Sequence, residues 1–430
     1  MSYFSYISLT PAVYTIIYQK NNHLKLKVNY MIDFSFTENQ LAVRDMASEV
    51  AQKIIIPNIA DFDREQKMNP ALLPAMAEAN LLGFCIPEQY GGLGMDYISL
   101  GLASEEMEYG DTSARVILSV HIGLFSLPVL TFANEEQKQK YLTPAAKGKK
   151  IATFGLTEPA AGSDVVGLQT TAVKDGDHYI LNGEKMWISL ADVADLFLIF
   201  AWTDLEKKKN RDHSGISCFI VESGWEGLTT GSLHGKLGVR AGNTGFISMQ
   251  DVKVPAENLV YKEGAGFKIA MFCLDQGRYT VAAGSCGLIK ACRDACVKYS
   301  KERQTFGVNI EEHQLVKQMI ANMEAGYEYS TYLWLKAGWL KNQGKRSTKA
   351  TSMAKWIACR EAEASAANAV QVHGAYGFSD EYPVERFYRN SKGASIYEGT
   401  REIHTLMQAD YVLGFRQDKE LELDLPIVEQ

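Results

Sequence analysis

The sequence lacks a long apolar run, a recognisable cysteine pattern and an excess of basic residues. No uninterrupted apolar stretch approaches the roughly 20 residues that span a bilayer, so we expect no membrane insertion. The net charge is −7 at pH 7, and Lys and Arg are scattered along the chain, which argues against a nucleic-acid partner. With 430 residues, 46% of them hydrophobic and 22% charged, the chain is long enough for two or three soluble domains.

The cysteines exclude two further classes of protein. There are seven, an odd number, and they form neither a disulfide framework nor a Cys-x-x-Cys site. Cys292 and Cys296 lie four residues apart and would share one helix face, but their apolar neighbours favour buried packing over metal binding. We therefore expect no metal site and a reducing, cytoplasmic compartment.

What the sequence does contain is a residue pattern that changes twice. Thr37 and Gln40 form a capping-box signature at the start of a helical region over residues 31–152. Short β-rich runs broken by Gly, Asp and Asn fill residues 153–262 and predict an antiparallel β-domain. Residues 263–416 return to a 3.6-residue period and predict a four-helix bundle, followed by a tail at 417–430. The expected helices are Phe267–Arg303, Ile310–Asn342, Thr348–Ala375 and Asp380–Leu413.

Three motifs carry the functional signal, in an order and at distances found in one flavoenzyme superfamily. They are FGLTEPAAGSD at 154–164, NGEKMWIS at 182–189 and ASIYEGTRE at 394–402. With them the chain resembles an acyl-CoA dehydrogenase over roughly residues 34–416. Composition and period alone give an α+β fold with several layers. The resemblance implies the acyl-CoA dehydrogenase-like arrangement, in which FAD lies between the middle β-domain and the C-terminal four-helix bundle.

Residues 1–30 precede the region of resemblance. They contain aromatic and β-branched residues, three lysines and no arginine, which suits neither a secretory signal nor an Arg-rich transit peptide. Because members of the family begin near Met31, we interpret this segment as an upstream over-extension of the reading frame. The alternative is a short extra hairpin.

Dehydrogenating an acyl thioester at its α and β carbons requires a base for the α-proton and an acceptor for the β-hydride. Side chains cannot accept a hydride, whereas the N5 atom of a flavin can. By resemblance, Glu398 is the base; an isolated Tyr-Glu-Gly-Thr sequence would be read instead as an exposed glutamate at a helix end. Some relatives carry the base just before the arginine that is Arg278 here. That position is Gly277, and glycine cannot take a proton.

The resemblance also assigns contacts to FAD. Leu156, Thr157 and Ser163 belong to a strand end and turn whose amides suit a flavin ring or a pyrophosphate, and Trp187 and Ser189 are the aromatic cover and the hydroxyl that reaches N5. The full set expected on the same subunit is Phe154, Leu156, Thr157, Ser163, Trp187, Ser189, Thr400 and Glu402.

A second set is placed by resemblance on the FAD of a neighbouring subunit, which implies a homotetramer built as a dimer of dimers. It consists of Arg303, Phe306, Gln314, Gln371 and Gly374. Arginine supplies the forked donors that a pyrophosphate accepts. Ala375 departs from the glycine usual at that turn, which puts close backbone approach there in doubt.

Contacts to the CoA thioester are expected from Ser163, Asp275 and Arg278, although Asp275 has an alternative as a helix-capping acid. The substrate class turns on Arg115, which aligns with the arginine that meets the distal carboxylate in glutaryl-CoA dehydrogenases. Val116 replaces the small polar residue expected beside it. We therefore favour an exposed Arg115 or one paired with Glu105, Glu106 or Glu108, and a short or medium straight-chain substrate.

The leading interpretation is an FAD-dependent acyl-CoA dehydrogenase that passes electrons to an electron-transfer flavoprotein. The alternatives are a glutaryl-CoA dehydrogenase, an acyl-CoA oxidase and a non-catalytic flavin-binding relative. His373 and His404 are assigned no role, and each has an alternative as a helix-surface residue.

Overall fold

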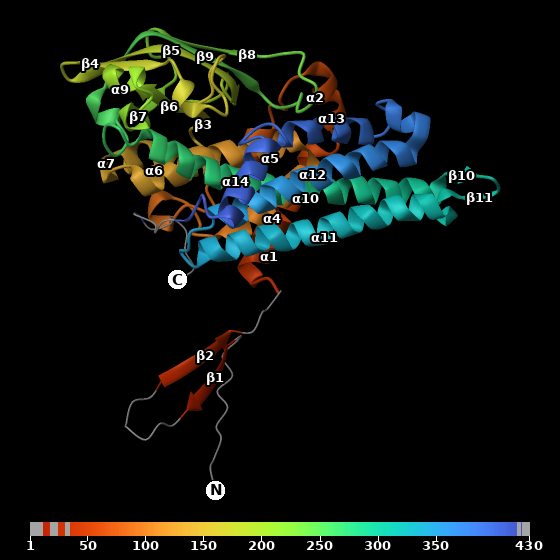
Figure 1. The fold of residues 1–430 in the computed structure, drawn as a ribbon. Coiled ribbons are helices and arrows are strands. Elements are labelled where there is room, and N and C mark those ends of the chain that lie inside the picture. Colours follow the sequence, from red (N-terminus) through yellow and green to blue (C-terminus); the bar gives the residue numbers. More distant parts are fainter. Residues whose placement is uncertain (1–11, 18–24, 31–34, 419–422, 424–430) are drawn as a thin grey trace.

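The computed structural model describes residues 12–17, 25–30, 35–418 and 423 (Figure 1). Strands β1 (Ala12–Ile17) and β2 (Lys25–Tyr30) pair antiparallel, and Figure 1 draws this hairpin apart from the rest of the chain. The pairing agrees with the hairpin alternative for residues 1–30. The remainder of that segment lies outside the described residues, and its interpretation as an over-extension stays a prediction.

Residues 35–150 form the expected helical region. The capping box at Thr37 and Gln40 is confirmed at the start of α1. The helices are α1 (Glu38–Val50), α2 (Ile59–Glu65), α3 (Leu72–Glu78), α4 (Tyr97–Gly110), α5 (Thr112–Leu118), α6 (Leu127–Phe132), α7 (Glu135–Gln137) and α8 (Thr143–Ala146).

A π-helical stretch, η3 (Ser119–Ser126), joins α5 and α6 into one continuous helix over Thr112–Phe132. Its 21 residues are long and apolar enough to cross a membrane, which a search for uninterrupted apolar runs missed because Arg115 and His121 interrupt it. However, 83% of its most apolar window is buried inside the protein. This helix is therefore a core helix.

The middle region forms a seven-stranded sheet in the order β3-β6-β4-β5-β9-β8, with β7 on β6. The antiparallel prediction holds for most of its pairs but is wrong for β3 and β4, which pair in parallel with β6. The strands are β3 (Ala152–Gly155), β4 (Thr171–Asp175), β5 (His178–Ser189), β6 (Leu196–Trp202), β7 (Ile216–Glu222), β8 (Leu228–Ser232) and β9 (Thr244–Pro255), and the short helix α9 (Leu205–Lys209) follows β6.

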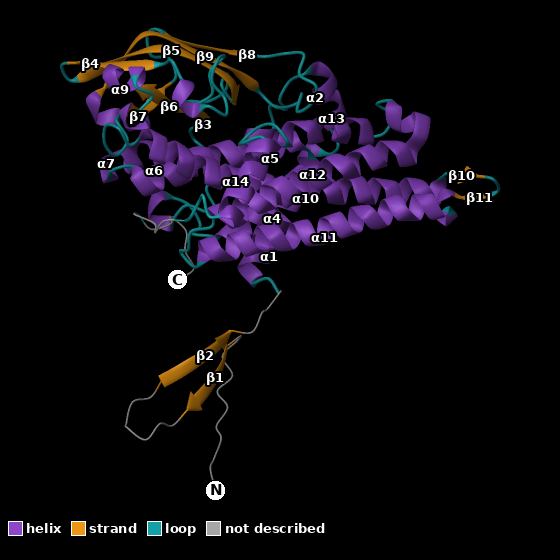
Figure 2. Ribbon diagram, in the orientation of Figure 1, coloured by secondary structure: helices purple, strands orange, loops and turns teal. Residues whose placement is uncertain are grey.

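The C-terminal region is helical, as Figure 2 shows, but the fourth expected helix is two. It breaks between Ala394 and Arg401, at the Tyr-Glu-Gly-Thr sequence. The helices of this region are α10 (Gly266–Glu302), α11 (Gln314–Asn342), α12 (Thr348–His373), α13 (Val384–Ala394) and α14 (Arg401–Leu413), with a small hairpin of β10 (Gln304–Thr305) and β11 (Val308–Asn309) between α10 and α11.

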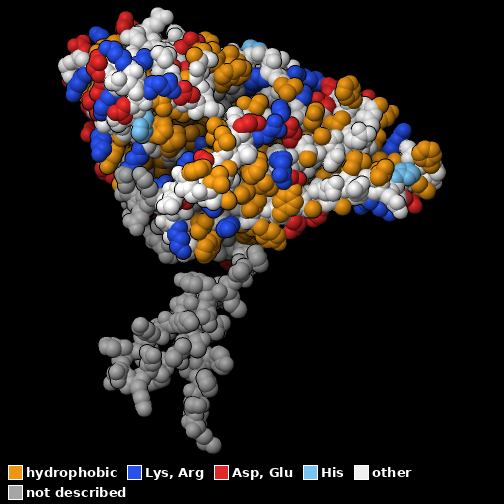
Figure 3. Space-filling model, viewed as in Figure 1, with side chains coloured by type: hydrophobic (Ala, Val, Ile, Leu, Met, Phe, Trp, Pro, Cys, Tyr) orange, Lys and Arg blue, Asp and Glu red, His pale blue; other side chains and the backbone are white. Residues whose placement is uncertain are grey.

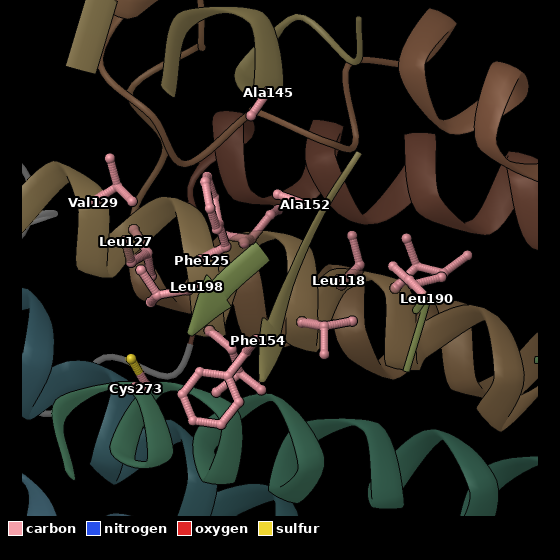
Figure 4. Close-up of a cluster of buried hydrophobic side chains, with 14 of the residues drawn as sticks. Leu118, Phe125, Leu127, Val129, Ala145, Ala152, Phe154, Leu190, Leu198 and Cys273 are labelled. Carbon is pink, nitrogen blue, oxygen red and sulfur yellow. The ribbon is translucent and has the colours of Figure 1, made fainter. Parts of the chain in front are cut away.

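One hydrophobic core runs through all three regions. Figure 4 shows side chains of the sheet, the Thr112–Phe132 helix and α10 meeting in it, among them Phe154, Phe125 and Cys273. His121 adds a polar link, because its Nδ1 accepts from the Ala152 amide at 3.1 Å and its Nε2 donates to the Ala145 carbonyl at 3.1 Å. Burial lowers the pKa of His121 to about 4, so the ring is neutral.

All seven cysteines are free and buried. Cys292 and Cys296 lie on α10 and belong to a second apolar cluster that this helix forms with α11, α12 and α13, which confirms the packing interpretation.

Candidate active site

Glu398 lies in the break between α13 and α14 and has a left-handed backbone, with φ of 56°. Gly399 follows with φ of 97°. Thr400 then begins α14 as its N-cap, its hydroxyl accepting from the Ile403 amide at 3.4 Å. A left-handed glutamate costs about 1–2 kcal/mol, so this turn must be held by contacts from outside it.

The carboxylate of Glu398 occupies the space that a side chain at position 277 would need. A Cβ placed on Gly277 would lie 2.0 Å from Glu398 Oε2 and 2.9 Å from Leu124. Because Gly277 has no side chain, it cannot serve as the alternative base, and it also leaves room for Glu398 to lie against α10. Two separate parts of the sequence meet here.

Glu398 is electrostatically prepared to take a proton. Its Oε2 is inaccessible to solvent and has no hydrogen-bond partner among the described residues. Burial raises the pKa of Glu398 to about 7, against the opposing effects of Arg115, Lys355 and Arg278. A carboxyl group with a pKa near neutrality is suited to general base catalysis.

Two buried cations hold the backbone of the turn. Lys355 Nζ donates to the carbonyls of Tyr397 at 2.9 Å and Gly399 at 2.6 Å, and Arg278 Nε donates to the carbonyl of Glu398 at 3.1 Å. Hydrogen bonds from charged donors contribute about 1.5–3 kcal/mol each, enough to offset the strain at Glu398. Sequence analysis missed Lys355, although a lysine on the alanine-rich face of a predicted helix was a usable signal.

Arg115 is salt-bridged, as favoured above, but it is fully buried and not exposed. Its Nε donates to Glu108 Oε2 at 2.5 Å, and its other nitrogens donate to Ser119 Oγ at 2.8 Å and Tyr397 Oη at 2.6 Å. Although burial opposes ionisation, Glu108 keeps the pKa of Arg115 above its ordinary value. This network reaches the residue next to Glu398.

The sheet presents an aromatic side chain at a strand irregularity. Trp187 lies where the pairing of β5 with β9 shifts register, has φ of 63°, and is 61% exposed. A bulge of this kind re-aims a side chain, and the exposed indole offers a flat apolar surface on this side of the sheet. Ser189 follows at the end of β5. This face fits a flat aromatic cofactor.

The turn after β3 is held by a buried ion pair. Lys185 donates to Glu158 at 2.8 Å and to the Leu156 carbonyl at 3.3 Å, and Glu158 also accepts from the Thr170 amide at 3.0 Å. The Met186 amide donates to the Thr157 carbonyl at 2.9 Å. The turn with exposed Ser163 is thereby fixed beside the strand that carries Trp187.

Phe154 does not face this open side. Its ring is buried and lies 5.1 Å from the ring of Phe200, and Figure 4 shows it within the core cluster. A side-chain contact between Phe154 and the cofactor is therefore not supported, because the alternation of β3 turns this ring to the helices. Leu156 is buried as well.

The residues assigned to a neighbour's cofactor gather at the far end of the helical region. Phe306 is 98% exposed at the tip of the β10–β11 hairpin with φ of 54°, and Arg303 and Gln314 flank that hairpin. Gln371 and Gly374 are exposed at the end of α12. Arg303 ends α10 about 39 Å along the helix from Gly277, at about 1.5 Å per residue. The two sets of expected FAD contacts are therefore far apart within one chain.

The other predicted residues near the turn are paired. Asp275 accepts from Arg278 at 3.3 Å and from the Thr348 hydroxyl at 2.5 Å. It lies inside α10, so the alternative that it caps its own helix is wrong. Glu402 is exposed and pairs with Arg401 at 2.7 Å.

The helix-surface alternative for His373 and His404 is wrong. His404 is 0% exposed and His373 2% exposed. His404 Nδ1 bonds to Ser352 at 2.9 Å, and His373 stacks on Tyr299 with ring centroids 4.2 Å apart. The partners of His404 and His373 are Ser352 of α12 and Tyr299 of α10, which come from distant parts of the chain, so the sequence around each histidine does not reveal its burial.

Comparison with known proteins agrees with this geometry. The chain matches all three domains of the acyl-CoA dehydrogenase family: the N-terminal domain at residues 37–149, the middle domain at 153–252 and the C-terminal domain at 264–413. It is 40% identical over 376 residues to a short-chain specific acyl-CoA dehydrogenase of Clostridium acetobutylicum, covering 87% of this chain and 98% of that protein.

Two solved structures also resemble this chain along most of its length. Butyryl-CoA dehydrogenase from Megasphaera elsdenii has a TM-score of 0.86 and 37% identity, covering 89% of this chain and 100% of that one. A glutaryl-CoA dehydrogenase in complex with glutaryl-CoA has a TM-score of 0.85 and 36% identity, covering 90% and 98%. FAD is the cofactor of these enzymes. The chain is thus an oxidoreductase that belongs to the FAD-dependent acyl-CoA dehydrogenase family.

Proposed function

We propose that the enzyme converts a short straight-chain acyl-CoA thioester to the trans-2-enoyl-CoA, with Glu398 as the base that removes the α-proton. The observation that carries this is the unpartnered Oε2 of Glu398 beside Gly277, with a pKa near 7. When bound, FAD would supply at N5 the acceptor for the hydride that leaves the β-carbon. Proton and hydride together account for the two hydrogens lost.

The protein groups around Glu398 suit this task. Lys355 and Arg278 fix the backbone on which the base is carried, and the three cations near it favour the carboxylate form that a base requires. Leu156, Thr157, Trp187 and Ser189 would hold the flavin on the sheet side, with Thr400 beside the base. Ser163, Asp275 and Arg278 would meet the CoA arm.

Two features favour a short straight acyl chain. The relatives with this specificity in their names are as similar to the chain as any reported above. In addition, the charge of Arg115 is already neutralised by Glu108 within the fold, so a plain aliphatic chain would leave no unpaired cation in the site.

Glutaryl-CoA dehydrogenation is the second candidate, because Arg115 is buried next to Tyr397 and a glutaryl-CoA relative is nearly as similar. The two candidates differ in the distal carboxylate, which would have to compete with Glu108 for the guanidinium. We expect kcat/KM for butyryl-CoA to exceed that for glutaryl-CoA. A clear preference for glutaryl-CoA would establish the second candidate.

The base assignment is tested by Glu398→Gln, which keeps the shape of the side chain and removes its proton affinity. We expect the variant to bind FAD and butyryl-CoA but to lose flavin reduction by roughly 10² to 10⁴-fold in the absence of oxygen. Glu105→Gln is a matched control, because Glu105 is also buried with a pKa raised to about 7 but is bonded to Tyr327, away from the turn. Near-normal reduction by Glu398→Gln would reject Glu398 as the base.

We further propose that an electron-transfer flavoprotein reoxidises the reduced enzyme, in a cytoplasmic setting that the seven free cysteines support. Reoxidation that is fast with such a carrier and slow with oxygen would distinguish a dehydrogenase from an oxidase.

A further inference from the structure

The turn that carries Glu398 is bridged by one buried lysine. Lys355, on α12, is 1% exposed. Its ammonium donates to the carbonyl before Glu398, that of Tyr397, and to the carbonyl after it, that of Gly399. The two hydrogen bonds therefore link Lys355 to the backbone on both sides of Glu398.

These two hydrogen bonds fix a backbone conformation that glutamate does not adopt readily. Glu398 and Gly399 are both left-handed, with φ of 56° and 97°, and glutamate lacks the freedom of glycine in that region. The carbonyls of Tyr397 and Gly399 point to Lys355, and that of Glu398 to Arg278. If the first two lost their donor, the turn would be free to relax and the carboxylate would move away from Gly277.

We propose that Lys355 is a positioning residue for the base, holding Glu398 in the left-handed turn that aims its carboxylate into the space above Gly277. This inference rests on the proposed function, since it assumes that Glu398 removes the α-proton. Lys355 acts through the backbone of residues 397–399, and its ammonium is engaged by carbonyls there. It is therefore distinct from the groups that meet substrate or cofactor.

The charge of Lys355 adds a second, measurable effect. The groups that face Glu398 come from four helices: Arg115 from α5, Arg278 from α10, Lys355 from α12 and the neutral His404 from α14. Removing one of the three cations makes the carboxylate harder to form. The pH at which flavin reduction is half-maximal should then rise.

The test compares Lys355→Met with Lys341→Met in the FAD-loaded enzyme. Lys341 is equally buried, at 1% exposed, but donates to Gln276 at 3.1 Å and makes no contact with the turn. For Lys355→Met we expect the rate of flavin reduction by butyryl-CoA to fall about 10²-fold, with KM little changed. The pH midpoint of flavin reduction should rise, and the isotope effect with α-deuterated butyryl-CoA should be larger than in the wild type. Lys341→Met should keep the pH midpoint and the isotope effect of the wild type.

Lys355→Arg keeps the charge and the donors, so it should recover part of the lost rate and restore the pH midpoint. If Lys355→Met does not fold, Lys355→Arg and Lys355→Gln are compared by the same readouts, and equal pH midpoints in these two variants would overturn the proposal. So would wild-type rate and pH midpoint in Lys355→Met. Loss of reduction in Glu398→Gln with normal reduction in Lys355→Met would reject this inference alone, whereas normal reduction in Glu398→Gln would reject the proposed function.

Discussion

At the scale of single residues, the site depends on a matched pair, Glu398 and Gly277. The carboxylate fills the volume that any side chain at 277 would occupy. Enclosure then makes the carboxyl group a better base, because a group that is hard to ionise in the free enzyme binds the α-proton more firmly. The nearby cations oppose this effect and keep the pKa of Glu398 close to neutral pH.

The pKa of Glu398 leads to a pH prediction. Burial raises it to about 7, and the base must be deprotonated to act, so kcat/KM for flavin reduction should rise with pH and level off above about 7. At pH 6 it should be about tenfold below the plateau. Rapid-mixing measurements between pH 5.5 and 8.5 check this, and Glu105→Gln should give the same profile. A profile that is flat over this range would show that Glu398 ionises well below pH 6 in the free enzyme.

At the scale of elements, the decisive feature is a helix that does not continue. The region from 380 to 413 has helical periodicity throughout, yet the chain leaves the helix after Ala394 and resumes at Arg401. The left-handed pair Glu398 and Gly399 produces this break. It turns a glutamate that would lie on a helix surface into one that faces α10.

A substitution at Gly277 in α10 should affect the stability of the protein and its activity differently. Gly277→Ala raises the helix propensity of α10 by about 1 kcal/mol, but its Cβ would overlap the carboxylate of Glu398. Because that carboxylate is the mobile end of a side chain, the protein should fold, while flavin reduction falls about 10²-fold.

Gly326→Ala in α11 is the control, since its Cβ would make an ordinary 3.4 Å contact with Glu361. Thermal unfolding and anaerobic flavin reduction are measured for both variants. Wild-type reduction by Gly277→Ala would mean that Glu398 does not act from the position described above.

At the scale of the whole molecule, the expected cofactor contacts form two groups, one on the sheet and at the start of α14, and the other at the β10–β11 end of the helical region. Figure 3 shows apolar side chains exposed at the tip where β10 and β11 lie. Phe306, Leu315 and Phe378 from this end are 98%, 73% and 89% exposed. Exposure of this extent at one end of a molecule favours contact with another copy.

We therefore predict a homotetramer in which this tip reaches a neighbour's FAD. Arg303→Ala should lower FAD occupancy and weaken the dimer together, because the same side chain would serve both. Lys301→Ala, two residues earlier and also exposed, should change neither. Sedimentation and the flavin-to-protein absorbance ratio measure the two quantities. A fully flavinated monomer would contradict the prediction.

The sequence by itself determined the succession of helical, β-rich and helical regions and, through the three motifs, the family and a candidate base, because hydrophobic period and motif order are local or ordered features. It also identified Gly277 as a departure from the relatives that carry the base at that position. It could not determine the parallel pairing of β3 and β4 with β6, the burial of His373 and His404, or the split of the last helix. Each of these depends on what packs against an element from a distant part of the chain.

The tertiary structure alone decided how the residues of the candidate site are arranged. Arg115 could be assigned a partner only after the fold placed Glu108, Ser119 and Tyr397 around it. Lys355 had no motif, and its importance follows from its two bonds to the turn. The pKa of Glu398 depends on burial and on three cations from three helices, and such a balance exists only when those helices are packed together.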